Sequence, residues 1–309
     1  MRPESFTITP SGPFSLAEAA TFGFGQRSAA AWDGVMRLAF CLDSYAGQAG
    51  AELRQDAAGG VRCTVHGPPG ADLDAVCGQI MRVLSLDHDG TGFAQVGQRD
   101  PVIGRLQAAA PGLRPPLFYS PYEAAAWAVL STRRPTRQMM QVRDRLSRAH
   151  GMCFELAGQP VTALPTPAQL LAVRSFPGIP GDRMSRLHGV ARAALDGQLD
   201  VTLLHRQGPE RAMTGLQAIP GIGPFYSALI VIRGTGFTDV LPAGEPRLRA
   251  LATQLYGLPA EPDEAGLRAL AEPWRPFRTW AAVLIRAAAA GVLAGPAAPR
   301  PGRAPAAVR

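Results

Sequence analysis

The 309-residue sequence contains no lysine and no asparagine. Its 31 basic residues are therefore all arginines, and against 24 acidic residues they give a formal net charge of +7. The double absence is first a sign of codon bias, since adenine-rich codons are avoided in GC-rich genomes. It also has a chemical consequence, because no reaction step can use a lysine amine as a Schiff-base nucleophile. Mechanisms of that class are excluded.

Cysteine is scarce, and the four that occur, Cys41, Cys63, Cys77 and Cys153, have no CxxC spacing. The usual sequence signatures of a zinc site and of an iron–sulfur cluster are therefore missing. We expect no cofactor of either kind, and free, mostly buried thiols in a reducing cytoplasm.

Long apolar runs are also rare. The most apolar late stretch, residues 280–293, is short for a membrane span and is broken by Arg286, so we predict a buried helix there. Residues 1–14 lack the apolar run of a signal peptide. A hydrophobic content of 47% with 18% charged residues is typical of an ordered globular protein without membrane segments. The positive charge favours an anionic partner, although many basic proteins bind nothing in particular.

Residues 1–110 have the texture of a small α+β domain. Short β-like segments fall at 6–9, 36–42, 51–55 and 61–66, and Gly59-Gly60 marks a turn between the last two. Apolar residues at helical spacing follow over residues 72–84. We expect an antiparallel sheet with a helix beside it.

Residues 111–294 are predicted to form a helical region, and from Pro121 to about Ala290 the pattern is helical nearly throughout. Candidate helices fall at 122–130, 137–149, 167–173, 182–195, 209–219, 224–233, 246–256, 264–271 and 278–290. Several begin with proline, whose missing N–H costs little at the first helical position. The Pro-, Ala- and Arg-rich tail, 295–309, is predicted to be disordered. The predicted fold class is thus mainly α, a helical body with a small N-terminal α+β domain.

The most informative segment runs from Leu216 to Pro224 and reads LQAIPGIGP. We expect a helix to end at Ile219, a hairpin to turn through residues 220–223, and Pro224 to open the next helix. Glycines leave the backbone uncovered, and amides at a helix N-terminus favour an anion. A DNA phosphate fits this description, in a contact independent of base sequence. The alternative is an ordinary αα-hairpin with a glycine-rich turn.

The residues after this hairpin, from Arg233 to Leu248, read RGTGFTDVLPAGEPRL. Together with DPVIGRL at 100–106, SPYEAA at 120–125 and EPWRPFR at 272–278, the arrangement resembles the helix-hairpin-helix DNA glycosylases. The resemblance is closest to the DNA-3-methyladenine glycosylase II family and covers most of the chain. It implies a two-lobed helical body with the hairpin on one rim of a DNA-binding cleft. It also implies a monomer that acts on double-stranded DNA containing damaged bases.

The resemblance assigns roles around the hairpin. The amides of Gly221, Gly223 and Tyr226 would hold a DNA phosphate. A monovalent cation can sit on hairpin carbonyls in the family, and here these would belong to Gln217, Ile219 and Gly221. Bifunctional relatives carry a lysine in the helix just after the hairpin, whereas this chain has Phe225 there. The substitution predicts a monofunctional enzyme without a lyase step.

The resemblance places the catalytic carboxylate at Glu245, where the family has an aspartate. Excision breaks the bond between a base and its deoxyribose after the base has been flipped out of the stack. The sugar becomes oxocarbenium-like, and a fixed carboxylate stabilises that charge. Glu245 precedes Pro246, so we expect it at the N-cap of the next helix. The alternative is that Glu245 is only a helix-start acid in a protein that recognises damaged or distorted duplex without cutting it.

Two other positions depart from the family pattern. Arg133 stands where the family has a residue that wedges into the gap left by the flipped base, and Arg134 beside it would grip phosphates. A solvated basic loop is the alternative. Arg286 stands where well-known relatives have a pocket tryptophan that stacks on a cationic base, and an arginine would repel such a base. The aromatic residues Tyr122, Trp127, Trp274, Phe277 and Trp280 are predicted to be core residues.

Overall fold

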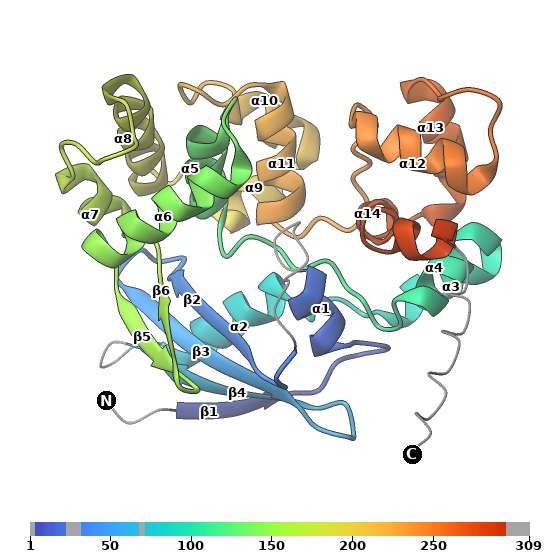
Figure 1. The fold of residues 1–309 in the computed structure, drawn as a ribbon, viewed down its shortest axis with the longest axis horizontal. Helices are drawn as coiled ribbons and strands as arrows, with labels where there is room; N and C mark the ends of the chain where they lie inside the picture. The colour runs from blue at the N-terminus through green and yellow to red at the C-terminus, as the bar shows by residue number, and fades with distance from the viewer. Residues whose placement is uncertain (1–3, 23–31, 68–71, 295–309) are drawn as a thin grey trace, which may run out of the picture.

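An antiparallel sheet lies at the base of the molecule in the view of Figure 1, and two groups of helices stand above it. The computed structural model describes residues 4–22, 32–67 and 72–294, so the expected disordered tail lies outside the described residues. The sheet has the strand order β1-β4-β3-β2 and consists of β1 (Glu4–Ile8), β2 (Met36–Cys41), β3 (Gln48–Gln55) and β4 (Val61–His66). Helices α1 (Leu16–Phe22) and α2 (Leu73–Val83) share a hydrophobic cluster with its strands. The predicted antiparallel sheet is confirmed, whereas α1 was not predicted.

A second, two-stranded sheet interrupts the region expected to be helical. Strands β5 (Cys153–Leu156) and β6 (Gln159–Thr162) form a hairpin whose turn, Ala157-Gly158, has positive φ at both residues. The alternation of Phe154 and Leu156 with polar residues is a strand signal of period two, so the helical prediction was wrong here. The hairpin packs on the main sheet, where the Phe154 ring fills the space above Gly50. A Cβ at Gly50 would lie 2.6 Å from that ring.

The first group of helices forms one lobe around a single hydrophobic cluster. It consists of α5 (Pro121–Ser131), α6 (Thr136–His150), α7 (Pro167–Ala172), α8 (Gly181–Leu195), α9 (Val201–Gln207), α10 (Pro209–Leu216) and α11 (Pro224–Gly234). Helix α5 is buried on nearly all sides and contacts both α8 and α11. A helix that is apolar all round belongs in the interior of a lobe, and α5 holds these neighbours in place.

The second lobe combines helices from distant parts of the chain (Figure 1). It consists of α3 (Thr91–Arg99), α4 (Pro101–Ala109), α12 (Pro246–Tyr256), α13 (Glu264–Leu270), the 3-10 helix η1 (Glu272–Trp274) and α14 (Arg278–Ala294). Helices α3 and α4 were not predicted, and they pack on the C-terminal helices. The fold is mainly α, as predicted. The domain limits expected around residue 110 stay a prediction, because these clusters report packing and not independent folding.

The aromatic residues largely follow the core prediction. Tyr122, Trp274, Phe277 and Trp280 are buried, and Trp127 is partly buried against the core of the first lobe. Residues 280–293 belong to α14, whose inner face is buried. Within the described ranges, no helix combines the length and apolarity needed to cross a membrane.

The cysteines are less buried than expected. Cys41 and Cys63 lie in the core, Cys77 is half-buried and Cys153 is exposed. Burial raises the pKa of Cys63 to about 12, so this thiol stays protonated at neutral pH.

Asp100 joins the separate segments of the second lobe. Its Oδ1 accepts hydrogen bonds from the backbone N–H groups of Val102 and Ile103, at 2.9 and 3.2 Å, and so caps α4. Its Oδ2 accepts from the Tyr256 hydroxyl at 2.5 Å and from Trp274 Nε1 at 2.9 Å. One buried carboxylate therefore connects α4, α12 and η1.

Asp100→Ala should lower the free energy of unfolding by about 3–5 kcal/mol, because it leaves buried donors without acceptors and removes a helix cap. Asp100→Asn, which keeps one oxygen acceptor, should lose less. Urea unfolding monitored by tryptophan fluorescence measures both. A loss below about 1 kcal/mol for the alanine variant would contradict the assigned role.

Candidate active site

The predicted hairpin lies between α10 and α11. Helix α10 ends at Leu216, three residues earlier than expected, and a turn over residues 217–223 leads to Pro224 at the start of α11. Gly221 is exposed and has a φ of +96°, in the left-handed region that favours glycine. The N-terminus of α11 has no side-chain cap within the described residues. The amides of its first turn, including that of Tyr226, therefore lack intrahelical partners.

Two buried isoleucines, Ile219 and Ile222, pack in the hydrophobic cluster of the first lobe and anchor this hairpin. A Cβ placed on Gly221 would lie 3.0 Å from Arg186 Cδ and 3.6 Å from Val129 Cγ2. The hairpin therefore packs against α8 and the C-terminal end of α5. These contacts fix the position of the hairpin, while its backbone stays exposed at Gly221.

The predicted wedge residue follows directly from the end of α5. Arg133 is exposed and has a φ of +52°, a backbone conformation that non-glycine residues rarely adopt. The Arg134 amide donates to the Ser131 carbonyl at 3.1 Å and closes the turn. Since α5 also contacts the hairpin, the structure brings Arg133, Arg134 and Gly221 to one edge of the first lobe.

Arg183 fixes this turn, although the sequence analysis did not single it out. Its guanidinium donates to the carbonyls of Val129, Leu130 and Thr132, at 2.7, 2.5 and 3.1 Å. These are carbonyls that the end of α5 leaves without helical partners. Burial lowers the pKa of Arg183, and the nearby charge of Arg134 lowers it further. Arg183 is thus a positioning residue for the loop that carries Arg133.

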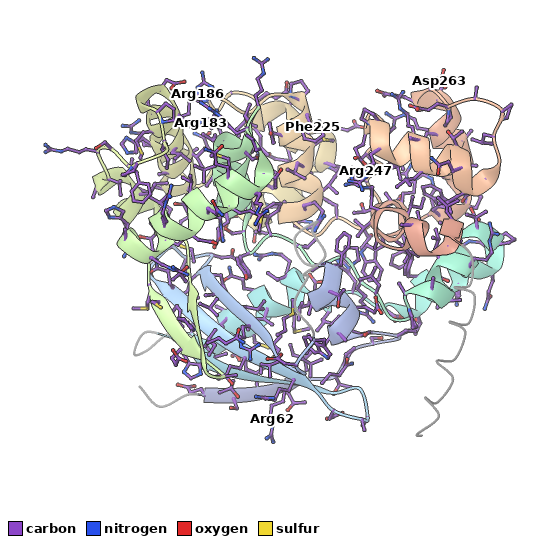
Figure 2. All side chains as sticks on the ribbon, viewed as in Figure 1. Arg62, Arg183, Arg186, Phe225, Arg247 and Asp263 are labelled. Carbon is purple, nitrogen blue, oxygen red and sulfur yellow. The ribbon has the colours of Figure 1, made fainter. Side chains whose placement is uncertain are left out.

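A cavity of about 610 Å³ lies between the two lobes. Its lining comes from α1, α11, the loop before α12, α12 itself and α14, with these residues: Phe22, Pro224, Phe225, Ala228, Leu229, Ile232, Arg233, Pro242, Gly244, Glu245, Arg247, Thr279, Ala282, Val283, Arg286, Ala287 and Ala290. Most of these side chains are apolar, and the size falls within the range of roughly 300–1,000 Å³ usual for ligand pockets. Figure 2 shows Phe225 and Arg247 at its two sides, with Arg183 and Arg186 further along the same edge of the molecule. Phe225 is 60% exposed.

Glu245 and Arg286 face each other in this pocket. Glu245 occupies the N-cap position of α12, but its carboxylate makes no capping bond. Instead Glu245 Oε1 accepts from Arg286 Nη1 at 2.5 Å. The pocket therefore holds the expected carboxylate in an ion pair with the arginine that was expected to line it.

Asp239 holds the loop that carries Glu245. Its carboxylate forms two hydrogen bonds with the Arg278 guanidinium, at 2.7 and 3.1 Å, and accepts a third from Arg275 at 3.0 Å. Thr279 adds a pair of hydrogen bonds with the backbone of Val240, each 2.9 Å long. Fork-like pairs of this kind fix geometry as well as charge. The loop of Glu245 is thereby tied to α14, the helix that carries Arg286.

Arg233 is a further pocket residue that the sequence analysis missed. Its guanidinium donates to the Pro116 carbonyl at 2.5 Å and lies 5.6 Å from the centre of the Phe22 ring. Burial and the nearby positive charge of Arg286 lower the pKa of Arg233 to about 10, so it stays cationic at neutral pH. The sequence signal that could have identified Arg233 is its position in the last turn of the helix that follows the hairpin.

The predicted site residues thus fall into two groups. Gly221, Gly223, Tyr226, Arg133 and Arg134 lie around one edge of the first lobe, whereas Glu245 lies in the pocket between the lobes. Within residues 4–22, 32–67 and 72–294, His, Cys, Asp and Glu side chains do not gather in threes that could hold a metal ion.

Comparisons with known proteins give the same family as the motifs. A Mycobacterium tuberculosis protein described as a probable bifunctional transcriptional activator/DNA repair enzyme AlkA is 30% identical over 225 residues, which are 72% of this chain and 44% of that protein. DNA-3-methyladenine glycosylase 2 of Escherichia coli is 28% identical over 228 residues, covering 72% of this chain and 77% of the relative. The chain is therefore a homologue of the DNA-3-methyladenine glycosylases. It spans less than half the length of the mycobacterial protein that it matches.

Solved structures extend the likeness to nearly the whole chain. A 3-methyladenine DNA-glycosylase from Archaeoglobus fulgidus superposes with a TM-score of 0.69 at 18% identity, over 92% of this chain and 97% of that one. The structure of MBOgg1 in complex with a low-affinity DNA ligand gives 0.72 at 16% identity, over 94% and 99%. A scan against family models found no match. The glycosylase fold, including the N-terminal sheet domain, is confirmed by these superpositions.

Proposed function

We propose that this protein is a monofunctional DNA glycosylase that removes modified bases from double-stranded DNA. The observation that carries the proposal is the Glu245 carboxylate in a base-sized pocket, next to a helix-hairpin-helix element with exposed amides. The E. coli relative is named for excision of 3-methyladenine. We expect the protein to act as a monomer, because both lobes and the pocket belong to one chain.

Binding begins at the edge of the first lobe. The amides of Gly221, Gly223 and Tyr226 would donate to one phosphate, and the dipole of α11 favours that anion. Arg134 would contact the backbone nearby. These contacts are independent of base sequence and position the duplex over the pocket.

Base flipping would follow, at a cost of a few kcal/mol that is smallest at a damaged pair. Arg133, held on its left-handed turn by Arg183, would fill the gap that the base leaves. The flipped base enters between Phe225 on one side and Arg247 on the other.

The chemical step breaks the bond between C1′ of the sugar and a ring nitrogen of the base. The electron pair leaves with the base, so positive charge develops on the sugar and negative charge on the base. Glu245 would stabilise the sugar cation by its fixed negative charge. Water then adds to C1′ and gives up a proton, which leaves an abasic site. With no lysine in the 309 residues, a Schiff-base lyase step has no amine of that kind to use.

The second candidate function is DNA binding without excision. It is favoured by the ion pair with Arg286, since this pair neutralises part of the charge that Glu245 would offer to the sugar. The hairpin and Arg133 would serve such a damage sensor equally well.

A monovalent cation at the hairpin is a further part of the proposal. The carbonyls of Gln217, Ile219 and Gly221 belong to the end of α10 and the turn that follows, where the helix dipole favours a cation. The Ile219 carbonyl already accepts from the Ile222 amide at 3.0 Å, which leaves it one lone pair. The cation would add positive charge between the hairpin and the phosphate.

The purified protein should be incubated with duplexes that carry single modified bases, followed by cleavage of abasic sites with alkali. Strand breaks that appear only after alkali support a monofunctional glycosylase. Breaks without alkali would contradict the absence of a lyase step. Tight binding with no abasic product on any base would favour the second function.

Arg133→Ala should lower the single-turnover rate of excision by about 10- to 100-fold, because the gap left by the base is no longer filled. Affinity for undamaged duplex should change only a few-fold, as one exposed arginine contributes little. Arg62→Ala is the matched control, since Arg62 is exposed on β4 at the opposite end of the molecule (Figure 2). Equal losses in both variants would contradict the wedge role.

A further inference from the structure

The pocket carries more positive than negative charge. Of the charged side chains that line it among the described residues, Arg233, Arg247 and Arg286 are basic and Glu245 is acidic. The one carboxylate is already paired with Arg286. A pocket with this charge balance disfavours a further cation and favours a neutral or electron-rich group.

From this charge balance we infer that the substrate is an uncharged purine bearing a carbonyl acceptor, such as hypoxanthine, and that Arg286 selects it over cationic alkylated purines. The inference rests on the proposed glycosylase function and names the substrate class of the same pocket. It also gives Arg286 a role in the chemistry, as a specificity-determining residue.

The donor capacity of the arginines supports this choice. A guanidinium has five N–H donors and no acceptor, and it matches the O6 and N7 acceptors of guanine-like purines. Arg286 uses Nη1 for Glu245, and its Nε is buried without a hydrogen-bond partner among the described residues. The same holds for Nε of Arg233. Because these two Nε atoms are buried, a base would meet the terminal N–H groups of the arginines, and the single carboxylate of the pocket is already paired with Arg286.

The electrostatic balance of the residues agrees with the donor count. Arg233 and Arg286 are near enough for their charges to repel, which is one cause of the lowered pKa of Arg233. The ring of Phe22 lines the pocket and lies against Arg233. A cationic base would therefore meet two arginines, whereas a neutral base would meet their donors.

An arginine in the pocket also helps the departure of a neutral base more than that of a cationic base. A cationic base leaves as a neutral molecule and needs no help. A neutral purine takes the electron pair of the broken bond and leaves as an anion, which solvent then protonates. Arg286 beside the carboxylate that stabilises the sugar can stabilise this anion by charge and hydrogen bonding. Glu245 and Arg286 thus match the opposite charges of the transition state.

The test compares single-turnover excision from two duplexes that differ only in the target base, hypoxanthine or 7-methylguanine. We expect hypoxanthine to be released at least tenfold faster by the wild-type protein. In Arg286→Met, which keeps an unbranched apolar stem but removes the charged guanidinium, this ratio should fall at least tenfold. Arg247→Met, at the exposed rim, should change the ratio in the same direction by less, and Arg62→Met should leave it unchanged.

Several results would overturn the inference. Equal or faster release of 7-methylguanine by the wild type would overturn the substrate class while supporting the glycosylase function. The inference would also fail if Arg286→Met slowed the release of both bases equally and Arg247→Met left the ratio of the two rates unchanged. Arg286 would then only position Glu245.

Release of neither base would instead contradict the proposed function. In that case both duplexes stay intact and serve as ligands. If the wild type bound the hypoxanthine duplex more tightly than the 7-methylguanine duplex, and Arg286→Met lost this preference, the inference would hold. Equal binding of the two duplexes by the wild type would overturn it. Thermal melting of each variant verifies that it is folded.

Discussion

Glu245→Gln should lower the rate of base excision on the order of 10³-fold while DNA affinity stays within a few-fold of the wild type. The amide has nearly the shape of the carboxylate but no charge, so it cannot stabilise the cationic sugar. The effect should fall on the chemical step, because Glu245 lies inside the pocket and not on the edge that would grip phosphates. Single-turnover kinetics with saturating protein separates this step from binding.

The matched control is Glu261→Gln, which removes a charge from an exposed acid in the same lobe that pairs with Arg249 at 3.3 Å. It should leave excision unchanged. Glu245→Asp should fall between wild type and Gln, since it keeps the charge but shortens the reach to Arg286. Full activity of Glu245→Gln would remove the carboxylate from the mechanism.

The helical lobes and the hairpin could be predicted because their signals are local. Proline at helix starts, the spacing of apolar residues and the PGIG turn each act over a few residues, and α11 and α12 begin at Pro224 and Pro246 as expected. The β5–β6 hairpin was missed because a strand of four residues shows its alternation at only two apolar positions, here Phe154 and Leu156. Helices α3 and α4 were missed because much of their stability comes from packing on η1 and α14, which lie at the other end of the chain.

The site was predictable only where a motif marked it. Glu245 and Arg286 were found through the family pattern, but their ion pair joins residues 41 positions apart and has no local signal. Arg183 and Asp239 act through contacts with the ends of α5 and α14, and such contacts depend on the tertiary fold. The charge balance of the pocket therefore emerges only when α11, α12 and α14 are brought together.

Gly221→Val should weaken binding to undamaged duplex by about 10- to 100-fold, the loss expected when one or two charge-assisted hydrogen bonds to a phosphate are misaligned. Valine is strained at a φ of +96°, and its Cβ would press on Arg186 Cδ at 3.0 Å. The turn must shift, and the amides of Gly221, Gly223 and Tyr226 shift with it. Fluorescence anisotropy at two salt concentrations measures the loss.

Gly257→Val tests whether that loss reflects the hairpin or only a destabilised fold. Gly257 has a φ of 62° at the end of α12, and a Cβ there meets nothing within 4 Å among the described residues. The backbone strain of about 1–3 kcal/mol is therefore comparable, but no DNA contact is expected at that place. This variant should melt earlier and bind DNA like the wild type. If Gly221→Val remains folded and also binds DNA like the wild type, the hairpin does not hold the phosphate. DNA binding must then depend on the arginines around Arg133.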